Sequence, residues 1–346
     1  MSRFRTILLG GLAAVGVIAA ACNANAGPTS AELAKMKQQY LRPETVPFPK
    51  ENPFSEAKVD LGHKLFFDPR LSGTSTMSCA SCHNPGLSWG DGLATGVGSS
   101  ANKLGRRSPT ILNLAWADAL MWDGRAGSLE QQATGPIEEP GEMNQSMPRL
   151  LTTLGDIPGY RDAFKIVFPG EPISATTIAK AIATFERTIV SGQAPFDRWI
   201  DGDEGAIDDA AKRGFVMFNT KANCSACHSG WRLTDDSFHD IGLPDQDLGR
   251  GKLVAGVEPL QHAFKTPGLR NIAGRAPYMH NGSVATMTEV IRHYNDRFVQ
   301  RPSLSAEIFK LNLTERDVGD LVAFLKTLTS TDAKIAVPVL PTMETN

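Results

Sequence analysis

An excess of charge of one sign is missing from this sequence. Its 35 Lys and Arg residues are balanced by 37 Asp and Glu residues, which leaves a formal net charge of −2 at pH 7. A nucleic-acid-binding surface carries a basic excess, so the sequence gives no support for nucleic-acid binding. A hydrophobic content of 41% and a charged content of 21% are typical of a globular protein, and the chain is long enough for two domains.

Apolar runs of membrane-spanning length are also missing. The run from Ile7 to Ala21 is too short to cross a bilayer. It follows two arginines and leads to the small-residue pattern Ala24-Asn25-Ala26, which is typical of a secretory signal peptide over residues 1–26. We therefore expect export, with no transmembrane segment in the mature chain. Lipoprotein anchoring through Cys22 is an alternative, but such signals usually begin with leucine, which favours cleavage after Ala26.

Cysteine is scarce, with five in the whole chain, and four of them form two copies of one motif: Cys79-Ala80-Ser81-Cys82-His83 and Cys224-Ser225-Ala226-Cys227-His228. Thiols three residues apart on a helical turn share one face, so both can reach the vinyl groups of one porphyrin. The histidine that follows can then bind the iron. Two disulfides would also use four exported cysteines, but they explain neither the spacing nor the histidines. We predict two covalently bound c-type haems, with His83 and His228 as iron ligands.

The two halves of the chain repeat the same layout. A segment of related lettering precedes each motif, Gly62-His63-Lys64-Leu65-Phe66 and Gly214-Phe215-Val216-Met217-Phe218. Long after each motif comes an amphipathic stretch with apolar residues at helical spacing, behind Ser174 and Thr314 as N-cap residues. The sequence thus predicts a mainly α fold of two c-type cytochrome domains with long haem-covering loops.

Changes in composition divide the chain further. A polar, glycine-rich break follows Ile200, and we expect the leading segment and the tail to be extended arms or mobile. The predicted units are a signal peptide (1–26), an N-terminal arm (27–53), a first cytochrome c domain (54–200), a second cytochrome c domain (201–332) and a C-terminal tail (333–346).

Several stretches resemble the bacterial dihaem cytochrome c peroxidases, in the family's order and over nearly the whole mature chain: Leu65–Ser72, Trp122–Arg125, Gly135-Pro136 and Phe264–Asn271. That superfamily includes the MauG-type enzymes, which use hydrogen peroxide to oxidise residues in a partner protein. The resemblance implies a periplasmic oxidoreductase. Its first domain would be peroxidatic, with a haem that meets peroxide, and its second haem would store or relay electrons.

The resemblance also implies roles for four further residues. Trp122 matches the tryptophan that lies between the haems and couples them. Gln132 and Glu142 match polar residues above the peroxidatic haem, where a carboxyl group can move a proton between the two peroxide oxygens and an amide can position peroxide or water. Pro136 matches a proline that overlies the same haem.

Two departures from the peroxidases point toward the MauG-like branch. Peroxidases that need reductive activation have a histidine that blocks the first iron, and the matching position here is Ser99, so we expect an open site. Their second haem takes a methionine ligand, and the matching position here is Tyr294, as in MauG-type enzymes; an anionic phenolate favours oxidised iron. The neighbouring candidates for this ligand are Met279, His280, Met287 and His293, of which Met287 should be tested first.

A third departure concerns calcium. The family's calcium site uses an asparagine that matches Arg107 here, together with backbone carbonyls that match Arg275 and Pro277. A guanidinium group cannot bind calcium and could replace its charge, so we do not count calcium among the cofactors.

Three functions remain open. The first is MauG-like oxidation of an aromatic residue in a periplasmic partner protein; the tryptophan that passes oxidising equivalents in MauG matches Ala222, so Trp231 is the substitute candidate. The second is a cytochrome c peroxidase that reduces hydrogen peroxide with electrons from a small cytochrome c or a copper protein. The third is a dihaem electron carrier without enzymatic activity, which would need both irons to be fully ligated by protein.

Overall fold

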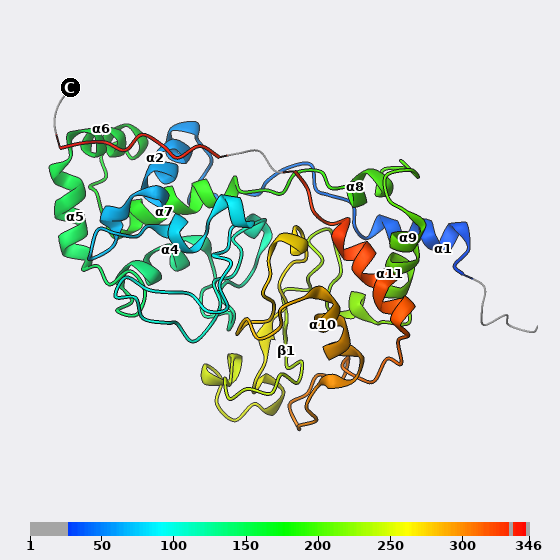
Figure 1. Cartoon of the computed structure of the whole chain (residues 1–346). Coiled ribbons are helices and arrows are strands. Elements are labelled where there is room, and N and C mark those ends of the chain that lie inside the picture. Colours follow the sequence, from blue (N-terminus) through cyan, green and yellow to red (C-terminus); the bar gives the residue numbers. More distant parts are fainter. Residues whose placement is uncertain (1–26, 332–334, 344–346) are drawn as a thin grey trace, which may run out of the picture.

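The computed structural model describes residues 27–331 and 335–343. The predicted signal peptide and Cys22 lie outside the described residues. Within the described ranges, none of the helices has both the length and the apolar character needed to cross a bilayer. The chain folds into two halves that lie side by side, with helices α2 and α4 to α7 in one half and α8 to α11 in the other (Figure 1).

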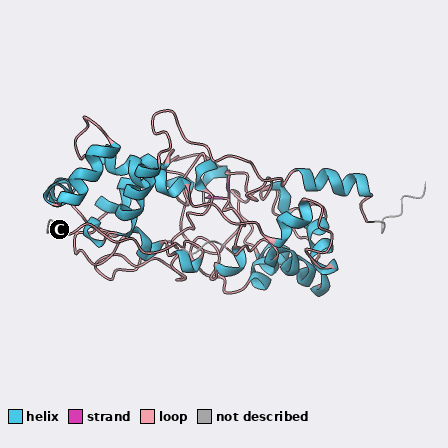
Figure 2. Ribbon diagram, turned by 90° about the horizontal axis from the view of Figure 1, so that it is seen from above, coloured by secondary structure: helices cyan, strands magenta, loops and turns pink. Residues whose placement is uncertain are grey.

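The fold is mainly α, as predicted. The longer elements are α1 (Ser30–Gln38), α2 (Glu56–Phe67), α3 (Cys79–Cys82), α4 (Leu129–Glu138), α5 (Met147–Asp156), α6 (Pro158–Val167), α7 (Ala175–Arg187), α8 (Pro195–Ile200), α9 (Asp209–Phe218), α10 (Met287–Arg292), α11 (Glu315–Lys326) and the antiparallel strands β1 (Phe238–His239) and β2 (Phe264–Lys265). Short 3₁₀ turns are η1 (Pro69–Leu71), η2 (Pro85–Leu87), η3 (Leu114–Trp116), η4 (Cys224–Ala226), η5 (Arg250–Lys252), η6 (Glu258–Leu260) and η7 (Ile272–Gly274), and η8 (His293–Arg297) is π-helical. Helices gather at the two ends of the molecule and loops fill the middle (Figure 2).

Each half is built on the same close crossing of two helices. Helix α2 crosses α7 at Gly62, where an added Cβ would lie 2.0 Å from the carbonyl oxygen of Ala181. Helix α9 crosses α11 at Gly214, where an added Cβ would lie 2.0 Å from the carbonyl oxygen of Asp320. Only glycine allows the backbones to approach this closely. The repeated glycine in the sequence therefore marks the repeated helix contact.

The predicted N-caps are confirmed. The Ser174 hydroxyl accepts a hydrogen bond from the backbone N–H of Thr177 at 3.2 Å, and α7 starts at the next residue. The Thr314 hydroxyl accepts one from the N–H of Asp317 at 3.2 Å ahead of α11. Each cap satisfies an N–H that the first helical turn would leave unpaired.

Each half has its own hydrophobic core. Residues of α2, α5, α6 and α7 form the first, which includes the fully buried Phe66. Residues of α8, α9 and α11 form the second, in which the rings of Phe215 and Phe324 meet edge to face at 5.6 Å. Two separate cores let each half hold its own motif in a fixed frame.

The two ends of the chain cross over between the halves. The predicted N-terminal arm contains helix α1, and Tyr40 just after it is fully buried in the second core, where its hydroxyl donates to Asn219 Oδ1 at 2.7 Å. Near the other end, the carbonyl of Pro341 accepts a hydrogen bond from Arg70 in the first half at 2.9 Å. Figure 1 shows α1 beside α9 and the tail running past α6. The expectation of an extended N-terminal arm was wrong for Ser30–Gln38, which form helix α1. Residues 335–343 form neither helix nor strand and pack against the first half as an extended tail.

Candidate haem sites and the residues between them

The two cysteine motifs form matching helical turns. Cys79–Cys82 is helix α3, and Cys224 begins η4. In each, the N–H of the histidine donates to the carbonyl of the first cysteine at 2.9 Å, for His83 and His228 alike. All four thiols are free. Two free thiols on one turn, next to a histidine, are the arrangement that covalent haem attachment requires.

Both histidines are oriented by a backbone carbonyl. The Nδ1 atom of His83 lies 3.3 Å from the Trp89 carbonyl oxygen, and that of His228 lies 3.0 Å from the Leu233 carbonyl oxygen. Burial lowers the pKa of both imidazoles, which keeps them neutral. Because Nδ1 is engaged as a donor, Nε2 is left to bind iron. The motif residues therefore fit a c-type haem in each half.

One group of side chains resembles a different metal site. Ligand atoms of Cys227, Asp235 and His239 lie within 4.8 Å of one another. His239 Nε2 is already 2.8 Å from an Asp235 oxygen. A thiolate metal site would compete with haem attachment for the Cys227 sulfur, and a thioether sulfur carries no charge. The carboxylate and imidazole are then best described as a hydrogen-bonded pair beside the second motif.

A large cavity opens beside the second motif, with walls from both halves of the chain. Cys224, Cys227 and His228 line one side, and Tyr294 and Trp122 also line it. The structure thus brings the predicted second-haem residues together with the predicted relay tryptophan. The predicted first-haem residues Cys79, Cys82, His83, Gln132, Pro136 and Glu142 do not line this cavity.

Tyr294 belongs to the π-helical segment η8, which continues α10. A π-helical turn frequently marks a functional position, because the wider turn re-aims a side chain. Burial raises the pKa of the Tyr294 phenol, and the nearby Cys227 and Cys224 act in the same direction. Met279 and Met287 line the same cavity, whereas His293 Nε2 is held 2.8 Å from the Ile241 carbonyl oxygen. His280 lines this cavity too. Ligation by Tyr294 stays a prediction, with Met279, Met287 and His280 as rivals.

Trp122 is held at the boundary between the halves. Its indole Nε1–H donates to the Arg107 carbonyl at 2.8 Å, and its own carbonyl accepts from the Lys265 N–H at 2.8 Å. The His280 ring lies edge-on to the indole at 6.3 Å. One partner comes from the first half and two from the second, so the indole is fixed relative to both motifs.

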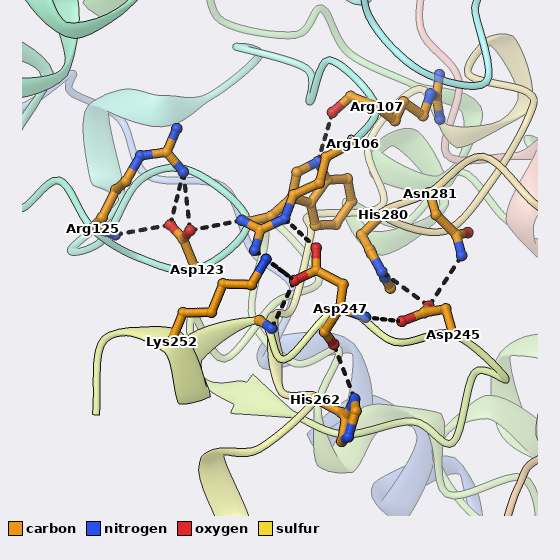
Figure 3. A network of polar contacts seen from close by, with 12 residues as sticks. Arg106, Arg107, Asp123, Arg125, Asp245, Asp247, Lys252, His262, His280 and Asn281 are labelled. Atoms are coloured by element: carbon orange, nitrogen blue, oxygen red, sulfur yellow. Dashed lines mark hydrogen bonds and ion pairs between the residues drawn. The ribbon is translucent and has the colours of Figure 1, made fainter. Parts of the chain in front are cut away.

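A charge network supports the loop that carries Trp122 (Figure 3). Arg106 bridges two carboxylates, with Nη1 2.6 Å from Asp123 and Nε 2.6 Å from Asp247. Arg125 also contacts Asp123, at 3.0 Å. Hydrogen bonds and ion pairs to Arg106 hold the pKa of both carboxyl groups below the ordinary range despite burial. Asp123 and Arg125 of the Asp-Gly-Arg sequence after Trp122 therefore stabilise the loop that carries the indole. The sequence alone had not identified Arg106 or Asp247 as part of this network.

At the first site, Glu142 and Ser99 lie next to each other. The Ser99 N–H donates to the Glu142 carbonyl oxygen at 2.7 Å, and the Ser99 hydroxyl is buried without a hydrogen-bond partner in the described structure. An added Cβ at Gly98 would lie 1.8 Å from the Gly141 carbonyl oxygen, so this contact requires a glycine. Burial raises the pKa of the Glu142 carboxyl. Burial also raises the pKa of the Cys82 thiol to about 11, and the charges of Asp91 and Glu142 add to this effect.

Gln132 and Pro136 lie one turn apart on α4. The Gln132 amide is 3.8 Å from the sulfur of Met121, the residue before Trp122. The Pro136 carbonyl accepts a hydrogen bond from the Met143 N–H at 3.1 Å, which ties α4 to the segment containing Glu142. No hydrogen bond joins the side chains of Gln132 and Glu142 in the described structure, and their joint role stays a prediction.

Two arginines, Arg107 and Arg275, stand at the positions that the resemblance matched to calcium ligands. Arg107 and Arg275 both line the large cavity, and each has a buried Nε without a hydrogen-bond partner in the described structure. Burial lowers the pKa of Arg275, and the charge of Arg107 lowers it further. Two guanidinium groups close enough to repel each other are a poor environment for a divalent cation, and the doubt about calcium stays a prediction. The sequence had singled out Arg107 but not the Arg275 side chain.

Comparisons with known proteins agree with this geometry. The model of the di-haem cytochrome c peroxidase family matches residues 56–205, and that of cytochrome c matches residues 211–329. The chain is 51% identical to the methylamine utilization protein MauG of Methylorubrum extorquens, over 97% of this chain and 96% of that protein. It is 48% identical to the MauG protein of Methylophilus methylotrophus, over 88% and 92% of the two chains.

A solved structure extends the similarity to the fold. A MauG-like protein associated with microbial copper homeostasis superposes with a TM-score of 0.76 at 34% identity, over 84% of this chain and 95% of that one. The family match, the two complete attachment motifs and the shared fold together mean that the protein carries two c-type haems and is a peroxide-using oxidoreductase. This chain belongs to the di-haem cytochrome c peroxidase family, in its MauG-like branch.

Proposed function

We propose that this protein uses hydrogen peroxide to oxidise a residue of a partner protein in the periplasm. The observation that carries this proposal is Ser99. The hydroxyl at this position is buried and unpaired in the described structure, beside the Glu142 backbone. A serine is a poor iron ligand, so the site would accept peroxide without prior reduction of the protein.

When bound, the haem of the first half supplies a redox-active iron that can cleave the O–O bond of peroxide. Glu142 would supply the proton transfer. The charge of its carboxyl acts on Cys82 of the first motif. Burial raises the pKa of this carboxyl, which brings the group closer to the pH at which it can both take and return a proton. Gln132 lies one turn before Pro136 on α4, and its side-chain amide would hold peroxide or water.

Trp122 would couple the two haem sites. Its indole is fixed by partners from both halves and lines the cavity of the second motif. The hydrogen bond from Nε1 to the Arg107 carbonyl would help the ring to lose an electron, because a neutral acceptor stabilises the positive charge that oxidation creates. The indole would therefore act as a relay without moving.

Tyr294 would bind the second iron. Burial raises the pKa of the phenol, so its proton leaves only when a cation faces the oxygen, which ferric iron would provide. A phenolate favours oxidised iron over reduced iron. This preference suits a site that stores oxidising equivalents better than one that delivers electrons, and it separates the proposal from the cytochrome c peroxidase alternative.

The partner would be a protein of methylamine utilisation, because the two relatives at 51% and 48% identity are both named methylamine utilization proteins. Trp231 is the candidate exit for the oxidising equivalents. It follows the second motif closely and lies edge-on to Trp116 with ring centroids 4.7 Å apart. Ala222, which matches the exit tryptophan of MauG, is buried and has no oxidisable side chain.

The proposal is tested by deleting the gene from its host during growth on methylamine. Intact mass spectrometry of periplasmic proteins should show one protein that loses an oxidative mass change, which the wild-type gene restores and Trp122→Phe does not. Cell fractionation and N-terminal sequencing of the mature protein test its location and the cleavage after Ala26.

The alternative functions predict different results. If no protein changes mass and purified protein with peroxide rapidly oxidises a reduced small cytochrome c, the protein is a cytochrome c peroxidase. If ferric EPR shows two low-spin haems that peroxide leaves unchanged, it is an electron carrier, and the enzymatic proposal is lost.

A further inference from the structure

Buried arginines in this protein normally have an acidic partner. Arg270 Nη1 lies 2.7 Å from Asp197, and Arg187 Nη1 lies 2.6 Å from Glu130. Burying an uncompensated charge is costly, whereas a paired and hydrogen-bonded charge is tolerated. An exception to this pattern within the described structure therefore calls for a missing anion.

The buried Arg275 is that exception, together with the partly buried Arg107. No carboxylate lies within 4.0 Å of either guanidinium in the described structure, and the Nε atoms of both are buried and unpaired. Only 6% of Arg275 is exposed, and one of its other donors is taken by the Gly268 carbonyl at 2.5 Å. The charge of Asp91 acts on Arg107 without an ion pair, and Asp91 Oδ2 already accepts a hydrogen bond from Ser108 at 2.7 Å.

The pair lies at the junction of the two halves. Arg107 belongs to the first half, and its Nη2 lies 3.9 Å from the Cβ position of Gly90, next to the residue whose carbonyl orients His83. Arg275 belongs to the second half, and both side chains line the cavity that contains the second motif. Figure 3 shows the Arg107 guanidinium pointing away from the acidic network around Arg106, so that network does not neutralise it.

We propose that Arg107 and Arg275 bind carboxylate groups of the haem cofactor at this junction and take the place of a divalent cation there. A c-type haem keeps its two propionate groups free, and planar guanidinium groups match the geometry of carboxylates. The unpaired Nε–H groups would then be satisfied, and the repulsion between the two arginines would be offset. The inference rests only on the presence of haem, and partner oxidation is not needed for it.

The test measures the reduction potentials of both haems in the purified holoprotein, without peroxide or partner, for Arg107→Gln and Arg275→Gln. Loss of a positive charge near the cofactor favours ferric over ferrous iron, so the potential of at least one haem should fall in each variant. Arg107→Lys and Arg275→Lys keep the positive charge, so both haems should have reduction potentials close to those of the wild type. These lysine variants keep the proposal testable if the glutamine variants are unstable. Arg161→Gln removes an exposed arginine on α6 and should leave both potentials unchanged.

A metal analysis completes the test. The wild-type protein should contain far less than one equivalent of calcium by mass spectrometry after purification, and EGTA should change neither its spectrum nor its melting temperature. Unchanged potentials in both glutamine variants, or one tightly bound calcium whose removal alters the spectrum, would overturn the proposal. Failure to find an oxidised partner protein would leave these readings untouched and would count only against the proposed function.

Discussion

The Ser99 N–H and the Glu142 carbonyl oxygen are joined by a hydrogen bond of 2.7 Å. The residue predicted to leave the first iron open and the residue proposed to move the proton are thus held on adjoining segments. Gly98 allows this approach, because any side chain there would collide with the Gly141 carbonyl. A substitution of Ser99 or of Glu142 should therefore alter the reaction with peroxide at the first haem site.

Replacing Ser99 by histidine should close the first site. An imidazole is a strong iron ligand, so Ser99→His should convert the high-spin ferric EPR signal to a low-spin one and slow the reaction with peroxide at least ~10-fold, the effect of a barrier increase of about 1.4 kcal/mol. Ser99→Ala is the matched control and should retain the high-spin signal. A high-spin signal in the histidine variant would mean that position 99 does not face the iron.

Glu142→Gln should remove the proton transfer while leaving haem content unchanged. We expect a 10²–10⁴-fold slower reaction with peroxide, the usual contribution of a general acid–base group. Because burial raises the pKa of Glu142, the wild-type rate should fall as the pH drops through a value above the ordinary 4.5, and the variant should lack this acidic limb. Stopped-flow absorbance over a pH series checks both points.

The same pKa shift has a consequence for stability. A carboxyl whose pKa is higher in the folded than in the unfolded protein binds its proton more tightly when folded, so its contribution to stability is lost as the pH rises through both values. Glu142→Gln should therefore raise the free energy of unfolding near neutral pH relative to wild type. Urea unfolding at pH 4 and pH 7 checks this, and a free energy of unfolding at pH 7 that is lower in the variant than in the wild type would contradict it.

The ligand of the second iron can be identified with two variants. Tyr294→Phe should leave both haems attached but abolish the low-spin ferric signal of the second haem, because a phenyl ring has no donor atom. Met287→Leu keeps the size and apolar character of its side chain and should leave that signal intact. The opposite pattern in the EPR spectra would assign the ligand to Met287.

The helix crossing of the second half is tested at two glycines of different environment. Gly214→Ala places a methyl group 2.0 Å from the Asp320 carbonyl oxygen and 2.8 Å from Phe324 Cβ, and overpacking of this kind costs about 1–3 kcal/mol or more. Gly319 lies on α11 with nothing within 4 Å of its Cβ position, so Gly319→Ala should raise stability by about 0.5–1 kcal/mol. Denaturant unfolding of both variants should move in opposite directions.

Much of this protein is determined by its sequence alone, because the decisive signals are local. The cysteine spacing and the adjacent histidine set one helical turn. The hydrogen bond from the His83 N–H to the Cys79 carbonyl oxygen needs no distant partner. The caps at Ser174 and Thr314 follow from their own side chains and the next three residues. A repeated glycine before each motif marked the repeated crossing, although its reason, contact with a backbone carbonyl, became visible only in three dimensions.

Only the tertiary structure decided how distant segments meet. It placed Tyr40 in the core of the second half and Pro341 against Arg70 of the first, and it fixed the Trp122 indole on the Arg107 carbonyl. It also brought the partly buried Arg107 and the buried Arg275 together without an acid at ion-pair distance. Such contacts depend on the packing of whole halves against each other, and hydrophobic periodicity or motif spacing carries no information about them. The sequence alone therefore determined the two predicted haem-attachment motifs, and the folded chain decided which residues lie between them.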